Sequence, residues 1–168
     1  MKLMKIIFLV AFLNITMNVN SEIAEVYSYK ANPGETAKML EHMAEAAAIQ
    51  REEGAHVTIN SLDVGSQQQV DYVVRFDSTD DWGAIRDRLQ ANEKWNDFQT
   101  KIGRNPSGTL ELSFAAINID QTTTASSFPN SGVYGVWVWD VATGKLPEVL
   151  ENFAKAKVIH EKLGARIE

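Results

Sequence analysis

The sequence predicts an α+β domain whose antiparallel sheet is covered by helices on one face. Segments with strand patterning and segments with helix patterning follow one another in the order strand, helix, strand, strand, helix, strand, and the start of this series recurs near the end of the chain. The composition, with 45% hydrophobic and 23% charged residues in 168, is that of a globular protein rather than a disordered or fibrous one. A net charge of −6 argues against nucleic acid as a partner.

Residues 1–21 have the pattern of a secretory signal. Lys2 and Lys5 precede a short apolar run over residues 6–13, and a small residue, Ser21, ends the segment. The alternative is an uncleaved membrane anchor, but a bilayer needs about 20 apolar residues and this run has far fewer. We therefore expect cleavage near Ser21, export to the periplasm or the extracellular space, and no stable membrane anchor.

The first predicted strand and helix lie between Glu22 and Gly54. Residues 22–31 are rich in β-branched and aromatic residues, which favours a strand. The segment Asn32-Pro33-Gly34-Glu35 ends this strand, and we expect Asn32 to cap the following helix. Three- and four-residue spacing predicts the buried stripe of that helix to be Leu40, Met43, Ala44, Ala47 and Ala48.

A hairpin follows the first helix. Residues 56–64 and 70–76 are both patterned as strands, and the second alternates apolar and polar residues with a period of two. The short connection between them contains Gly65, which favours antiparallel pairing.

A second helix and a fourth strand complete the unit. Ser78 and Asp81 have capping-box spacing, and apolar residues from Trp82 to Ile102 form a stripe that Asn92 interrupts, so we expect a break near residues 91–93. Residues 109–119 are patterned as a strand. The complete order over residues 22–119 is that of the split βαβ, or ferredoxin-like, fold.

The composition of residues 120–131 predicts a polar linker, and residues 132–168 are predicted to be a partial second copy of the unit. With a shift of 110 residues, the segments 26–58 and 136–168 align without a gap and share nine identities, including two glycines in the same register. The alternative is that two strand–helix pieces share glycine and alanine by chance. The second copy would consist of a strand and a helix only, so we expect a truncated repeat or a fragment of a longer protein.

The residues around the helix starts resemble those of the dimeric α/β-barrel superfamily, and its NIPSNAP-like and antibiotic-biosynthesis-monooxygenase-like members in particular. The similarity rests on Pro33-Gly34, on the segment from Phe76 to Trp82 and on the segment from Glu93 to Phe98. It covers residues 22–119 once and residues 133 onward in part. The resemblance implies that two sheets pack their helix-free faces together, either in a homodimer or as an intrachain pseudo-dimer.

Five aromatic residues are candidates for lining a small apolar ligand site: Tyr27, Tyr29, Trp95, Trp137 and Trp139. The alternative is that these side chains pack in the core and in the barrel. No catalytic residue can be assigned, and no metal site is expected, because His42, His56 and His160 lack ligand spacing and the chain has no cysteine. Some superfamily members degrade haem, but the resemblance would then require a histidine on the second helix, and this segment has none. We therefore expect no cofactor.

Two functional hypotheses remain open, with a third of a different kind. The first is an exported α/β-barrel protein that binds a small apolar molecule. The second, which the resemblance supplies, is a cofactor-independent monooxygenase acting on an aromatic or lipid-like substrate. The third is a subunit that only self-associates. The sequence does not decide whether the protein is an enzyme.

Overall fold

The computed structural model describes residues 21–62, 69–129, 132–133, 135–165 and 167. The predicted signal segment lies outside the described residues up to residue 20, and so does most of the connection between the two hairpin strands. Among the described helices, none combines the length and the apolar character needed to cross a membrane.

Four antiparallel strands form one sheet in the order β2-β3-β1-β4. Their bounds are β1 Ile23–Ala31, β2 His56–Ser61, β3 Gln69–Phe76 and β4 Gly108–Ile117. Together with the helices between β1 and β2 and between β3 and β4, this order confirms the ferredoxin-like α+β fold. The strand β4 forms one edge of the sheet, and β2 forms the other.

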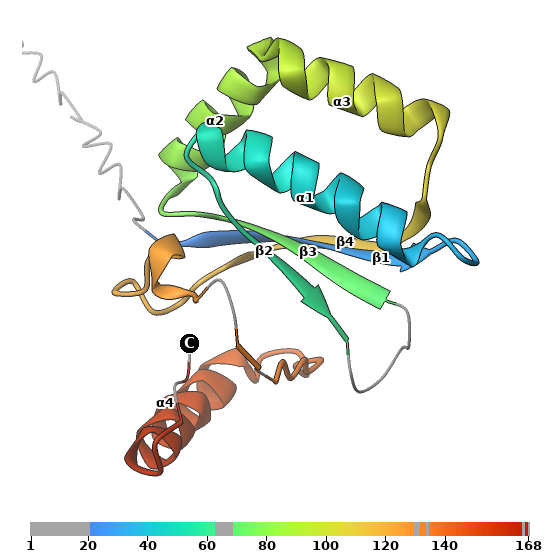
Figure 1. Ribbon diagram of the computed structural model, residues 1–168. Coiled ribbons are helices and arrows are strands. Elements are labelled where there is room, and N and C mark those ends of the chain that lie inside the picture. The colour runs from blue at the N-terminus through green and yellow to red at the C-terminus, as the bar shows by residue number, and fades with distance from the viewer. Residues whose placement is uncertain (1–20, 63–68, 130–131, 134, 166, 168) are drawn as a thin grey trace, which may run out of the picture.

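Three helices cover the same face of this sheet (Figure 1). They are α1 Thr36–Glu52, α2 Thr79–Ala91 and α3 Glu93–Arg104. The break predicted near residues 91–93 is confirmed: Asn92 is extended, with ψ 117°, and its side chain accepts a hydrogen bond from the Trp95 amide at 3.1 Å. The predicted cap at Ser78 is also present, since its hydroxyl accepts from the Asp81 amide at 3.1 Å.

The helix α1 begins later than the sequence predicted, and Asn32 does not cap it. Pro33 and Gly34 form a turn instead, in which Gly34 has φ +79°, a left-handed conformation that favours glycine. The Asn32 side chain donates to the Pro106 carbonyl at 2.9 Å and so holds the strand end to the loop before β4.

The buried face of α1 is also displaced from the prediction. Met43 and Ala47 are buried as expected, whereas Leu40, Ala44 and Ala48 are exposed. The alanine-rich sequence fits several stripes, and the sheet selects the one with the larger apolar side chains. The buried residues of this helix are Met39, Met43, Ala46, Ala47, Ile49 and Gln50.

The hydrophobic core lies between the helices and the sheet. Alternate residues of β3 point into it, and Val57 and Val74 are completely buried. At one end of the core, the Tyr72 hydroxyl donates to Gln50 Oε1 at 2.5 Å. Burial raises the pKa of Tyr72 far above its ordinary value, so this phenol is a permanent donor.

The opposite, helix-free face of the sheet is partly covered by the segment after β4. We call residues 118–128 the connector; it contains the short helix η1, Ala125–Ser127. The connector lies on the side of the sheet away from α1, α2 and α3 (Figure 1). Thr123 and Ala125 are buried there, whereas Leu112 and Phe114 on β4 remain about half exposed.

The C-terminal part contains the helix α4, Leu146–Lys162, which has the same length as α1 and begins and ends 110 residues after it. The glycines that flank the two helices agree as well, with φ of +79° and +78° at Gly34 and Gly144 and of +100° and +86° at Gly54 and Gly164. These agreements support the repeat, which remains a prediction.

The strand expected before α4 is not formed in the described residues. Residues 135–141 lie outside the four-stranded sheet, and Val136, Trp137 and Val138 are at least 70% exposed. A strand needs a hydrogen-bonding neighbour, and the described part of the chain provides none at this position.

Candidate functional site

A buried carboxylate lies on the helix-covered face of the sheet. Glu25 occupies a β1 position between Ile23 and Tyr27, which both contact the hydrophobic core. Its side chain is 12% exposed. A charged group at such a position is costly unless it is paired and hydrogen-bonded, so its partners define the site.

Three donors surround this carboxylate. The Tyr27 hydroxyl donates to Oε2 at 2.9 Å, and the Trp82 indole N–H donates to Oε1 at 2.7 Å. The Arg86 guanidinium donates to the same Oε1 and forms an ion pair with it. We call these four residues the Glu25 cluster.

Local structure explains why Trp82 and Arg86 reach Glu25 together. They are four residues apart on α2 and therefore lie on the same side of that helix. The Arg86 guanidinium is 5.3 Å from the centre of the Trp82 ring, so the cation and the indole also contact each other. Trp82, expected to be buried, is instead 36% exposed and uses its N–H toward the carboxylate.

The chemistry of the cluster follows from its burial. Burial, and then the hydrogen bond and charge of Glu25, raises the pKa of Tyr27 above its ordinary value, with Arg86 opposing this effect. Burial alone raises the pKa of Tyr29. Both phenols are therefore neutral at physiological pH, and Tyr27 acts as a hydrogen-bond donor to Glu25.

An exposed apolar surface adjoins the cluster on β4. The strand register pairs Ala115 with Glu25 and Ser113 with Tyr27, so these side chains lie on the same face. Leu110 and Ile117 lie on this face too, and they are 45% and 60% exposed. We call this surface, made of Leu110, Ser113, Ala115 and Ile117, the β4 shelf. It is a strip with small side chains at its centre, beside the polar groups of the cluster.

The structure separates the five predicted ligand residues into two groups. Tyr27, Tyr29 and Trp95 are half-buried and pack against the hydrophobic core; Trp95 also stacks on Phe98, with ring centres 5.6 Å apart. Trp137 and Trp139 are exposed in the segment before α4. Tyr27 is the one member of the five that also belongs to the Glu25 cluster.

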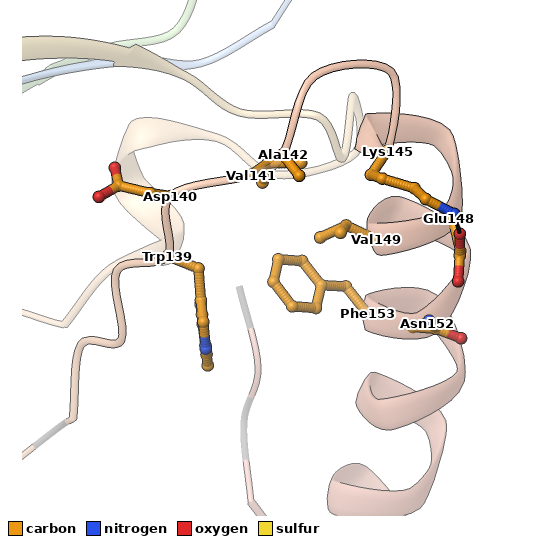
Figure 2. Close-up of a pocket in the computed structure, with 9 residues that line it drawn as sticks. All are labelled: Trp139, Asp140, Val141, Ala142, Lys145, Glu148, Val149, Asn152 and Phe153. Carbon is orange, nitrogen blue, oxygen red and sulfur yellow. Dashed lines mark hydrogen bonds and ion pairs between the residues drawn. The ribbon is translucent and has the colours of Figure 1, made fainter.

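Trp139 lines a shallow, open hollow of about 430 Å³ beside α4 (Figure 2). Its ring lies 5.2 Å from that of Phe153, and Val149 adds a further apolar wall. Lys145 and Glu148 form an ion pair at the rim, 2.8 Å apart. This hollow occupies the side of α4 that corresponds to the core-facing side of α1.

The contacts that join Glu25, Trp82 and Arg86 were not predicted from the sequence. One signal was present: Glu25 is the charged member of the otherwise apolar or aromatic series Ile23, Glu25, Tyr27 and Tyr29. The i, i+4 spacing of Trp82 and Arg86 was a second signal, although it does not name their partner.

Among the described residues, no group of three or more His, Cys, Asp and Glu side chains is arranged so that it could hold a metal ion. The His42 ring contacts the buried Ser107 hydroxyl, with Nδ1 and Oγ 3.0 Å apart. His56 lies on the helix-free face, and His160 is exposed on α4.

Comparison with known proteins finds a matching family model over just under half of the chain. Residues 24–106 match the family model of NIPSNAP. A search of curated proteins finds no match to the chain.

Similar solved structures cover 58–59% of the chain. They include a NIPSNAP family protein of unknown function from Agrobacterium tumefaciens, with 22% identity, a TM-score of 0.47, and coverage of 59% of this chain and 87% of that one. A NIPSNAP domain protein from Burkholderia xenovorans has 21% identity, a TM-score of 0.47, and coverage of 58% and 92%. A candidate antibiotic biosynthesis monooxygenase from Chloroflexus aurantiacus has 16% identity, a TM-score of 0.45, and coverage of 59% and 94%.

Proposed function

Starting from the match of residues 24–106 to the NIPSNAP family model, we propose that this protein binds a small, largely apolar molecule on the β4 shelf, beside the Glu25 cluster. The observation that carries the proposal is the contrast between the two neighbouring surfaces. The Glu25 carboxylate is buried and fully engaged with donors, while the apolar strip next to it is exposed.

The shelf has the composition expected of a binding surface. Apolar residues provide the area that a ligand removes from water, at about 25 cal/mol per Å². Ser113 and Ala115 have small, exposed side chains. Trp82, which is 36% exposed, supplies an aromatic face next to Glu25, the register partner of Ala115. A few oriented polar groups next to apolar area are typical of small-molecule sites.

Titration with 1-naphthol tests the proposal. We expect saturable binding to the unmodified protein and strong loss of binding in Ala115→Phe, because the added ring occupies the shelf. Ala116→Phe is the matched control, since it makes the same change one residue away on the opposite face of β4. Absence of saturable binding, or equal loss in both variants, would contradict the proposal.

Oxygen consumption in the same samples separates binding from catalysis. We expect no uptake that depends on 1-naphthol. Oxygen uptake that requires 1-naphthol and is lost in Ala115→Phe would contradict a binding protein and favour the second hypothesis, a cofactor-independent monooxygenase.

We further propose that the open part of the helix-free face is covered by a second sheet, in a homodimer or within a longer chain. Leu112 and Phe114 are 54% and 45% exposed on this face. Val26, which pairs with Phe114 from the neighbouring strand β1, is half-buried. Adjacent exposed apolar side chains of this kind favour a protein interface.

A further inference from the structure

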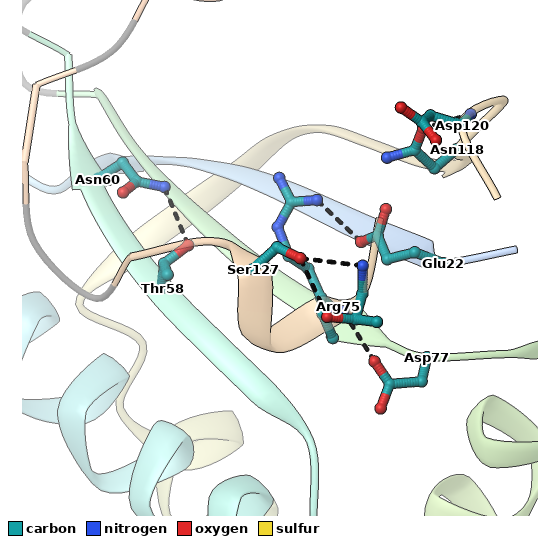
Figure 3. A network of polar contacts seen from close by, with 10 residues as sticks. Glu22, Thr58, Asn60, Arg75, Asp77, Asn118, Asp120 and Ser127 are labelled. Atoms are coloured by element: carbon teal, nitrogen blue, oxygen red, sulfur yellow. Dashed lines mark hydrogen bonds and ion pairs between the residues drawn. The ribbon is translucent and has the colours of Figure 1, made fainter. Parts of the chain in front are cut away.

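The connector returns across the sheet after β4 instead of leaving it. The Asn118 amide donates to the Glu22 carbonyl at 2.8 Å, and the Ala125 amide donates to Asp77 Oδ1 at 2.8 Å. These bonds join the connector to the start of β1 and to the end of β3. Figure 3 shows η1 beside Arg75, with the Asp77 carboxylate bonded to it.

Two basic side chains lie beneath the end of the connector. His56 on β2 and Arg75 on β3 are directly opposite each other in the strand register, so they share the helix-free face. The Phe128 ring lies over the Arg75 guanidinium, 3.4 Å from its carbon atom to the ring centre. Arg75 also pairs with the almost fully buried Glu22 at 2.8 Å.

This closed arrangement leaves two nitrogen atoms without partners among the described residues. His56 Nε2 and Arg75 Nε are both buried and make no hydrogen bond there. Each such atom costs about 1–3 kcal/mol relative to its hydrated form. Water can reach both atoms once the connector leaves, so their burial opposes the contacts that hold the connector closed.

We propose that the connector is an acid-sensitive latch, which covers the His56–Arg75 end of the helix-free face while His56 is neutral and leaves it when His56 is protonated. A protonated His56 would stand directly opposite the Arg75 cation, and like charges in opposite positions destabilise a sheet. Release of the connector gives both cations access to water.

The groups around His56 determine the direction of this response. Burial lowers the pKa of His56, and the Arg75 and Arg51 charges lower it further. The Phe128 backbone and Asp77 act in the opposite direction, but Asp77 already accepts the Ala125 amide, and Glu22 is already paired with Arg75. Because the closed state disfavours protonation, the latch is complete above the ordinary histidine pKa and is lost as the pH falls below it.

Hydrogen exchange at the Ala125 amide tests the latch in the full chain. After correction for intrinsic exchange, we expect protection to fall about three- to tenfold between about pH 7.5 and about pH 5.5. The Val57 and Val74 amides in the core report global stability and should not change.

Variants separate the latch from a general acid effect. In His56→Gln, which cannot acquire a charge, we expect protection at Ala125 to persist at the lower pH. His42→Gln should behave as the unmodified protein, and Phe128→Ala should lose protection at both pH values. Protection that is independent of pH in the unmodified protein, or that falls equally in His56→Gln, would overturn the proposal.

Discussion

The two members of the Glu25–Arg86 ion pair differ in burial, so we expect their replacement to lower the free energy of unfolding by different amounts. The Glu25 side chain is 12% exposed, whereas that of Arg86 is 44% exposed. Arg86→Gln leaves a buried carboxylate with only the Tyr27 and Trp82 donors, and we expect it to lower the free energy of unfolding by about 3 kcal/mol. Glu25→Gln leaves a cation that water can reach, and we expect a loss of about 1–2 kcal/mol.

The effects of the two substitutions on the free energy of unfolding should not be additive. In the double variant the uncompensated charge is absent, so we expect its loss to fall short of the sum of the single losses by about 1–2 kcal/mol. Urea denaturation followed by far-ultraviolet circular dichroism measures all three values. The exposed pair Lys94 and Glu52 is the control, and neutralising either residue should produce no measurable change.

A Glu25→Gln variant as destabilised as Arg86→Gln, or an additive double variant, would contradict this prediction. Equal losses would mean that burial does not distinguish the two groups. Additivity would mean that the ion pair contributes nothing beyond the separate packing of its members.

Three further predictions concern other parts of the chain. Leu112→Glu should shift the protein toward the monomer in sedimentation equilibrium, because the charge enters the apolar part of the helix-free face; an unchanged mass would exclude this face as a homodimer interface. After expression of the full sequence, mass spectrometry should place the mature N-terminus directly after Ser21, and retention of residues 1–21 would contradict the predicted export. Asn92→Ala should cost about 1 kcal/mol of unfolding free energy because the Trp95 amide loses its cap. Asn96→Ala is the control for this last change, and an equal loss there would show that the cap has no special role.

The strands and the helix break were predictable because local rules determine them. Alternation along β3 fixes which side chains face the core, and Asn92 both ends α2 and caps the next helix. The predicted start of α1 was wrong because two local sequence signals compete at this position. Asn32 is a good cap, but Gly34 adopts a left-handed turn that postpones the helix, and the Asn32 amide bonds to Pro106 instead.

The candidate site could not be predicted in the same way. Trp82 and Arg86 lie 57 and 61 residues from Glu25 in the sequence, and they meet it only because α2 packs over β1 with one particular side toward the sheet. Neither a periodicity nor a capping rule contains that information. The charged residue at a core-facing position of β1 indicated that a partner must exist, although it did not identify the partner.

Comparison of α1 with α4 distinguishes the features of a helix that local sequence determines from those that depend on tertiary packing. Their lengths agree, and so do the left-handed glycines before and after them, since short-range signals at each end are shared. Their environments differ completely: Met43 is buried under the sheet, whereas Phe153, at the corresponding position of α4, is 40% exposed. The boundaries of these helices thus depend on a few residues at their ends, while burial of their apolar faces depends on a sheet. A second sheet beside α4 would bury Phe153 as the first sheet buries Met43, and it would fill the hollow next to Trp139.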